Sequence, residues 1–184
     1  DWKLALALAY KVVQYSEMLA TMFRSMVVRE IVKGTSQALW DKYIRLGIEA
    51  IETKRDQALL DLIEKAIDEF NAIEIKTEEP LSVGLIGEIY IKYNNFGQLG
   101  ITQWLQQQGI EVIVPSLMSF LLQSFVNNKV NHNNNIERTT IIERTFTKGL
   151  QMYIESRDRR WEKLKEKFRF YRPEPNIFEI AKDA

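Results

Sequence analysis

The sequence predicts a helix-rich α/β fold in which one βαβ unit is flanked by long helices. Apolar residues recur at spacings of three and four through most of residues 1–79, which is the helical period. Two short β-branched runs follow, at residues 81–86 and 110–114, and a helical stretch separates them. Parallel strands need such a crossover helix. We therefore predict a helical region over residues 1–79 and a second region, residues 80–184, that opens with the βαβ unit.

The first region is predicted to hold two or three helices. Residues 1–33 read as one or two helices that stop at Gly34. Thr35 or Ser36 is then the expected N-cap of a helix over residues 37–71. The apolar stripes are Leu4, Leu8, Val12, Tyr15, Leu19, Met22 and Met26, followed by Leu39, Tyr43, Leu46, Ala50, Leu59, Leu62, Ala66 and Phe70. The methionines at 18, 22 and 26 are spaced as a core or partner-facing stripe.

The βαβ unit is predicted from the order of its short segments. Residues 81–86 read as a buried strand, residues 87–97 as a loop, residues 98–108 as a helix and residues 110–114 as a second strand. Two strands rarely make an independent sheet, and their edges carry unpaired N–H and C=O groups. We therefore expect the sheet to be incomplete here, and further strands of the full-length protein or of another chain to pair with it.

The rest of the second region is predicted to be helical. Helices are expected over residues 116–127, 136–170 and 177–181, the last one cut short by the end of the chain. The loop between the first two is rich in asparagine and contains His132, which is expected to be solvated. Because the chain begins at Asp1 without a methionine, we expect it to be a piece of a longer protein.

Composition excludes several classes of site. The chain of 184 residues has no cysteine and one histidine, so it offers no cysteine-held zinc or iron–sulfur site, no thiol nucleophile and no disulfide. Its 25 basic and 25 acidic residues cancel, which removes the whole-chain argument for nucleic-acid binding. Its apolar runs are too short to cross a membrane. We expect no metal site, no nucleic-acid partner, no membrane segment and a cytoplasmic location.

The loop over residues 87–97 is the candidate ligand site. It follows a parallel strand and precedes a helix, which is where open α/β sheets bind ligands. Glu88 could bind a hydroxyl group or act as a base, and Lys92 could meet a phosphate. Three aromatic side chains could form an apolar wall: Tyr90, Tyr93 and Phe96. The alternative is a structural turn, in which Gly87 supplies a positive φ and the aromatic rings pack. No dinucleotide or phosphate-loop fingerprint is present.

A basic tract near the C-terminus has two interpretations. Eight basic residues fall within residues 157–172, and aromatic residues are interleaved with them. Such a combination can bind nucleic acid through phosphate contacts and stacking. The favoured alternative is an amphipathic helix whose aromatic side chains are core and whose charges are solvated. The spacing of Glu162 and Lys165 fits ordinary surface pairing on such a helix.

The βαβ stretch also resembles a known family. Residues 80–117 read PLSVGLIGEIYIKYNNFGQLGITQWLQQQGIEVIVPSL. They resemble the segment VGIVGEIY-x-x-YNPF…LE-x-x-G-x-EV-x-x-PP of the 2-hydroxyacyl-CoA dehydratase family, above all in the large activase-related proteins. Residues 28–35 resemble that family's RPYE-x-x-x-G-[ET] linker, and residues 175–181 resemble a helix that precedes its next segment. The matching loop residues are Gly87, Glu88, Tyr93, Asn94 and Phe96, which are the candidate ligand-binding residues.

The resemblance implies a Rossmann- or flavodoxin-like parallel sheet. The resemblance also implies two cofactors for the full-length protein. These are an iron–sulfur cluster held by cysteines, and ATP, which the activator uses. This chain departs from the pattern, because it has no cysteine, and because Asn95 stands where the family commonly has proline. Cluster chemistry is therefore not carried over, and no catalytic residue or cofactor is assigned.

Three functions stay open from the sequence. The first is a non-catalytic α/β segment of a dehydratase- or activase-related protein. Such a segment would shape a surface for acyl-CoA or for a partner, and the partner would be the rest of the polypeptide or a related subunit. The second is a structural or protein-interaction module with no ligand site. The third, an RNA-binding domain that uses the basic tract, has the least support.

Overall fold

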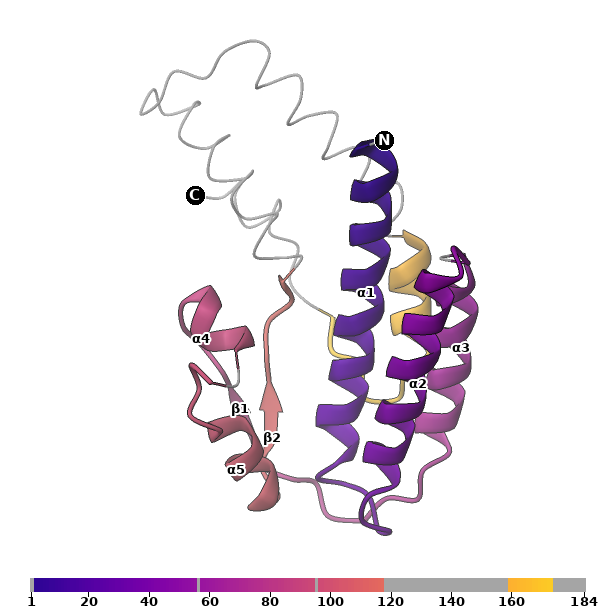
Figure 1. Cartoon of the computed structure of the whole chain (residues 1–184). Coiled ribbons are helices and arrows are strands. Elements are labelled where there is room, and N and C mark those ends of the chain that lie inside the picture. Colours follow the sequence, from indigo (N-terminus) through magenta and orange to yellow (C-terminus); the bar gives the residue numbers. More distant parts are fainter. Residues whose placement is uncertain (1, 56, 95, 118–158, 174–184) are drawn as a thin grey trace, which may run out of the picture.

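The structure is a helix-rich α/β fold in which a bundle of helices lies beside a small parallel sheet (Figure 1). The computed structural model describes residues 2–55, 57–94, 96–117 and 159–173. Helical residues come first along the chain, the βαβ unit follows, and the last described segment returns to the bundle. The predicted fold class is confirmed at this level. The division into two regions at residue 80 stays a prediction.

The bundle is built from three long helices and a short fourth segment. These are α1 (Trp2–Met26), α2 (Thr35–Glu52), α3 (Ala58–Asn71) and the helical residues 159–165. A single antiparallel bridge between Glu30 and Ile75 ties the chain after α1 to the chain after α3. Asn71 fixes the last segment, since its side chain donates to the Lys167 carbonyl at 2.8 Å and accepts from the Arg169 N–H at 3.1 Å.

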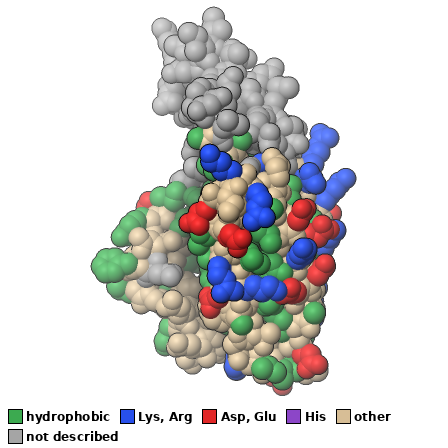
Figure 2. Space-filling view, turned by 45° about the vertical axis from the view of Figure 1, so that its right-hand side comes forward, with side chains coloured by type: hydrophobic (Ala, Val, Ile, Leu, Met, Phe, Trp, Pro, Cys, Tyr) green, Lys and Arg blue, Asp and Glu red, His purple; other side chains and the backbone are tan. Residues whose placement is uncertain are grey.

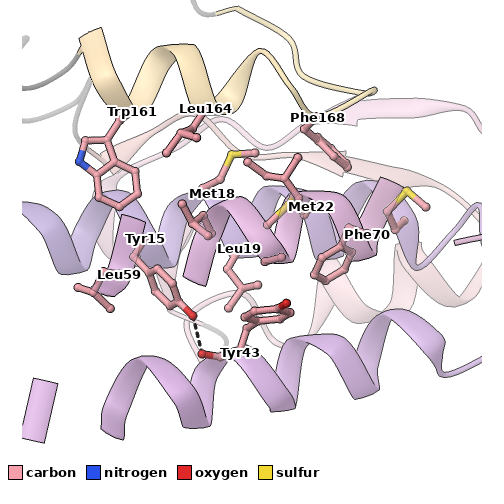
Figure 3. Packing of buried hydrophobic residues seen from close by; sticks show 14 of the residues in the cluster. Tyr15, Met18, Leu19, Met22, Tyr43, Leu59, Phe70, Trp161, Leu164 and Phe168 are labelled. Carbon is pink, nitrogen blue, oxygen red and sulfur yellow. Dashed lines mark hydrogen bonds between the residues drawn. The ribbon is translucent and has the colours of Figure 1, made fainter. Parts of the chain in front are cut away.

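The core of the bundle follows the predicted apolar stripes (Figure 3). Met18, Met22 and Met26 are all buried, which confirms their assignment to a core stripe. The Tyr15 hydroxyl donates to the Tyr43 carbonyl at 2.6 Å and so joins α1 to α2 inside the core. The segment 159–173 closes one side of the bundle with three buried side chains: Trp161, Leu164 and Phe168.

The predicted βαβ unit is present, and its strands are parallel. Strand β1 (Ser82–Gly84) pairs in register with β2 (Glu111–Ile113), and helices α4 (Ile89–Tyr93) and α5 (Ile101–Gln107) connect them. Each strand is shorter than predicted. The loop predicted over residues 87–97 contains α4, and the helix predicted over residues 98–108 begins only at Ile101.

The prediction of a buried first strand is wrong. All three residues of β1 are exposed, and the flanking Leu81 and Ile86 are 78% and 89% exposed. The sequence is apolar enough for a strand covered on both faces, but α1 and α5 pack against β2 instead. As a result Val112 on β2 is buried, while β1 forms the uncovered margin of the described sheet.

The helix boundaries differ from the prediction in two places. The helix predicted over residues 37–71 is divided into α2 and α3, and Lys54 between them has a left-handed φ of 55°. The first helix stops at Met26, well before Gly34. Gly34 instead precedes α2 in a left-handed conformation, with φ of 91°. Thr35 is the first residue of α2, so the expected cap at position 35 or 36 is wrong.

A more distant carboxylate caps α2. The Glu30 side chain is 1% exposed and accepts from the N–H of Gly34 at 2.8 Å and from the N–H of Ser36 at 2.7 Å. These are two of the N–H groups that a helix N-terminus leaves without a helical partner. A carboxylate at this end of a helix is also favoured by the helix dipole.

Several predictions lie outside the described residues. They concern the helix after residue 117, the asparagine-rich loop with His132, the helix before residue 159 and the helix over residues 177–181. Within the described part, the last long helix ends after residue 165 rather than at Phe170. None of the described helices combines the length and the apolar character needed to span a membrane.

Candidate functional site

Two edges of the sheet hold the polar groups of interest. At the amino edge, β1 and β2 begin at Ser82 and Glu111; at the carboxyl edge they end at Gly84 and Ile113. Helix α1 runs alongside β2 in the opposite direction (Figure 1). The C-terminal end of α1 therefore lies near the amino edge, and its middle lies near the carboxyl edge.

At the amino edge, one buried carboxylate gathers four donors. The Glu111 side chain is 3% exposed. Its Oε1 accepts from Ser25 Oγ at 2.7 Å, and its Oε2 accepts from Arg29 at 3.0 Å, Ser82 Oγ at 2.8 Å and Arg172 at 2.8 Å. Burial alone would raise the pKa of Glu111, but hydrogen bonds from Arg29, Ser25 and Ser82 outweigh it and lower the pKa to about 2.

This amino-edge cluster is a structural joint. Arg29 is itself buried, donates to the Ser25 carbonyl at 2.7 Å, and lies 4.3 Å from the centre of the Phe170 ring. The cluster thereby connects α1, both strands and the C-terminal segment. A carboxylate that already accepts four hydrogen bonds and stays ionised is poorly suited to take up a proton as a general base.

The predicted site residue Glu88 caps α4. Its Oε2 accepts from the Tyr90 N–H at 2.9 Å, and its side chain is exposed. The preceding Gly87 has a positive φ of 159°, a backbone conformation that L side chains rarely adopt, as the structural-turn interpretation expects. These contacts are what the structural-turn interpretation expects. They leave one oxygen of Glu88 without a hydrogen bond from the described residues.

The other predicted site residues do not converge on Glu88. The Tyr93 hydroxyl donates to the Pro115 carbonyl at 2.6 Å, which places this ring at the carboxyl edge. Asn94 Oδ1 accepts from the N–H of Phe96 at 2.8 Å and from the N–H of Gly97 at 3.2 Å, and so closes a tight turn. The Phe96 ring is 82% exposed. Within the described chain, no hydrogen bond joins Glu88 to Tyr93, Asn94 or Phe96.

The described part of the basic tract packs as the structural alternative expects. Trp161 and Phe168 are buried in the core. Lys165 pairs with Glu162 at 2.6 Å, the spacing predicted for a surface pair. Arg169 donates to the Ile73 carbonyl at 2.7 Å. These two aromatic rings are therefore not available for base stacking in this fold, while nucleic-acid binding itself stays untested.

Sequence reasoning missed a polar stripe on α1, of which Glu17 reaches the carboxyl edge. Glu17 accepts from Ser116 Oγ at 2.8 Å and from the Leu117 N–H, so it holds the chain as it leaves β2. Arg24 donates to Thr21 Oγ1 over 3.4 Å. Burial lowers the pKa of Arg24 to about 10, while the charges of Glu17 and Tyr93 act in the opposite direction.

A signal for these residues was present in the sequence. Positions 17, 21 and 24 follow the i, i+4, i+7 spacing of one helix face. The helix was interpreted only through its apolar stripe, and this second, polar stripe marks the face that meets the sheet.

The part of the chain that the structure describes shows no metal centre. Comparison with known proteins adds no family. Among the described residues, no group of three or more His, Asp or Glu side chains is arranged to hold a metal ion. Sequence models of protein families, curated proteins and solved structures were all compared with the chain, and none of them matches. The resemblance of residues 80–117 therefore stays an interpretation of those residues alone.

Proposed function

We propose that this chain is a non-catalytic segment of a 2-hydroxyacyl-CoA dehydratase- or activase-related protein, and that β1, α4 and α5 form its docking surface. The occupant would be the neighbouring part of the same sheet, a parallel apolar strand with its covering helix. That strand would come from the rest of the polypeptide or from a related subunit. The observation that carries the proposal is the concentration of exposed apolar side chains on this unit.

The exposed apolar side chains gather between residues 81 and 113. Of the 14 exposed large hydrophobic side chains in the described structure, 11 lie in this stretch. They are Leu81, Val83, Ile86, Tyr90, Ile91, Tyr93, Phe96, Leu99, Ile101, Trp104 and Ile113. Single exposed hydrophobic residues are ordinary, but a concentration of this kind on one small unit is typical of an interaction surface.

The docking surface is also nearly free of charge. Residues 81–110 contain only Glu88 and Lys92 as charged side chains. On the bundle, acidic and basic side chains are intermixed over the surface (Figure 2). On the smaller part of the molecule, which holds the sheet with α4 and α5, hydrophobic side chains gather at the margin. Depletion of charge is the compositional signature of the buried centre of an interface.

The outer edge of β1 favours a strand as the occupant. The Leu81 carbonyl accepts from the Glu111 N–H, and the Leu85 N–H donates to the Ile113 carbonyl, each at 2.8 Å. Because backbone groups alternate along a strand, those of Ser82 and Gly84 point to the opposite side. Within the described residues they have no backbone partner there. An open strand edge of this kind is completed by pairing with another strand.

The resemblance supports a dehydratase- or activase-related protein as the larger assembly. It supports reading β1 and β2 as adjacent strands of a larger Rossmann- or flavodoxin-like sheet in a cytoplasmic protein. In such an assembly the iron–sulfur cluster would belong to other parts, because this chain has no thiol ligand. The ATP site would belong to the activator part, since this chain has no phosphate-loop fingerprint. Docking is favoured over acyl-CoA binding at Glu88, because the predicted ligand residues do not converge.

Site-specific photo-cross-linking in cells tests the docking surface. A benzophenone amino acid is placed at Phe96, which is 82% exposed on the proposed surface, or at Ile48, which is 52% exposed on α2. We expect light-dependent cross-links from position 96 to a dehydratase- or activase-related polypeptide, identified by mass spectrometry. Position 48 is the matched control and should give none.

Three results would contradict the proposal. They are the absence of any cross-link from position 96, equal cross-linking from position 48, and cross-links from position 96 only to proteins unrelated to this family. Folding is checked in parallel, since replacing a side chain as exposed as Phe96 should leave the free energy of unfolding within about 0.5 kcal/mol.

A further inference from the structure

The carboxyl edge contains a cation whose bonding capacity is unused. A guanidinium group has five N–H donors in a fixed planar fork. Arg24 is half-buried on α1, and its one hydrogen bond to the described residues is the 3.4 Å contact with Thr21 Oγ1. No carboxylate oxygen of the described residues lies within 4.0 Å of it. Desolvation of a guanidinium without an ion pair is costly, so such a group needs an explanation.

The neighbouring arginines show what a satisfied guanidinium looks like in this fold. Arg29 and Arg172 both donate to Glu111. Arg169 donates to the Ile73 carbonyl at 2.7 Å and contacts Met26 Sδ at 3.8 Å. Arg24 is the exception among these four, because it contacts neither a carboxylate nor a backbone carbonyl in the described structure.

The Arg24 side chain is directed away from the C-terminal end of α1 and toward the carboxyl edge. Its bond to Thr21 runs toward the N-terminal end of α1, and Glu17, one turn further, holds Ser116 just after β2. On the other side of this edge, the Tyr93 hydroxyl donates to the Pro115 carbonyl just after β2. The carboxyl ends of parallel strands are where α/β sheets bind ligands.

The other polar groups at this edge are already engaged. The Tyr93 hydroxyl donates to Pro115, the Ser116 hydroxyl donates to Glu17, and both Glu17 oxygens accept hydrogen bonds. Arg24 therefore remains as the group that can receive a ligand, and a guanidinium fork matches a phosphate or carboxylate in a bidentate manner.

We propose that Arg24 binds the oxyanion group, phosphate or carboxylate, of a small molecule at the carboxyl edge of the sheet. The anion-binding group is on α1, outside the docking surface, and of the exposed apolar residues only Tyr93 borders both. Anion binding by Arg24 is therefore tested independently of the proposed function. Neither the predicted ligand residues nor the basic tract includes Arg24.

Nuclear magnetic resonance of the Arg side-chain Nε–H groups tests the proposal on the whole chain. The protein is titrated with inorganic phosphate and, separately, with acetate, at constant ionic strength set with sodium chloride. We expect a saturable shift of the Arg24 signal with at least one anion. Saturation by phosphate alone identifies a phosphate ligand, and saturation by acetate alone identifies a carboxylate ligand.

Two variants and a control complete the test. Binding to them is followed through the backbone amide signals of α1, because the Arg24 Nε–H signal is absent from both variants. Arg24→Gln should weaken binding about tenfold or more, since a hydrogen bond to a charged group is lost, and Arg24→Lys should bind with intermediate affinity. Arg45→Gln, an exposed arginine on α2, should leave the affinity unchanged. Arg24 has no ion pair to lose, so the folded spectrum of Arg24→Gln should be retained. The absence of a saturable shift with both anions, or undiminished affinity in Arg24→Gln, would overturn the proposal.

Discussion

Replacing Glu111 by glutamine tests the amino-edge cluster through the pH dependence of stability. The pKa of Glu111 falls from 4.5 to about 2 on folding. A lowered pKa stabilises the fold above the unfolded-state pKa, and this stabilisation is lost as the pH falls toward the folded-state value. The shift corresponds to about 3 kcal/mol at neutral pH, of which about 2 kcal/mol disappears between pH 7 and pH 3.

We therefore expect Glu111→Gln to lower the free energy of unfolding by about 3 kcal/mol at pH 7 and by only about 1 kcal/mol at pH 3. At neutral pH the amide leaves the buried Arg29 without its carboxylate, which accounts for the large cost. Urea denaturation at both pH values, followed by circular dichroism, measures the difference. Other carboxylates with lowered pKa values, such as Glu64 and Glu69, are common to both proteins and cancel.

Glu49→Gln is the matched control. Glu49 pairs with Arg55 at 3.3 Å, and both side chains are more than half exposed, so the change should stay within about 0.5 kcal/mol at pH 7. If Glu111→Gln destabilised the protein equally at pH 7 and pH 3, the reasoning would fail. The cost would then come from packing and not from a carboxylate held ionised by its partners.

Three further predictions concern the backbone, and denaturant unfolding measures each. Gly47→Ala should destabilise the fold by about 1 kcal/mol, because the new Cβ would lie 2.7 Å from the Tyr15 ring, which is held by its hydrogen bond to Tyr43. This clash should cost more than the gain in helix propensity. A stabilised variant would show that the ring can move. Glu30→Gln should lower the free energy of unfolding by about 1–3 kcal/mol, because the new NH2 group cannot accept from an N–H group at the start of α2. An unchanged midpoint of denaturant unfolding would contradict the capping role. Leu99→Gly and Lys54→Gly should each stabilise by about 0.5–1 kcal/mol, since both residues have a left-handed φ, and a loss in both would refute the strain argument.

The core could be predicted because it is periodic. The stripe that contains Leu19, Met22 and Met26 repeats with the helical period, and those residues are buried as expected. The boundaries were harder, since the cap of α2 comes from Glu30, outside the usual N-cap position. The burial of β1 was mispredicted for a different reason. An apolar strand sequence indicates what the strand is suited to contact, not whether the chain itself provides that contact.

The candidate sites were the least predictable part. Glu111 and Ser25 are 86 positions apart, and Ser116 and Glu17 are 99 apart, so no local pattern connects them. The loop around Glu88 was found because its position after a strand is a general feature of α/β sheets. Its internal bonds, such as the tight turn at Asn94, depend on backbone geometry that the residue types alone do not determine.

The return of residues 159–173 to the bundle has a consequence for folding during synthesis. Helices α1, α2 and α3 leave the ribosome long before Trp161 and Phe168 are made, so the seam that these two residues cover is open in the nascent chain. The bundle is thus completed by contacts of high sequence separation, such as the pairing of Asn71 with Lys167 across 96 positions. Proteins dominated by such contacts fold more slowly than helical bundles with neighbouring partners. The early helices therefore need protection from aggregation until residues 159–173 have been translated.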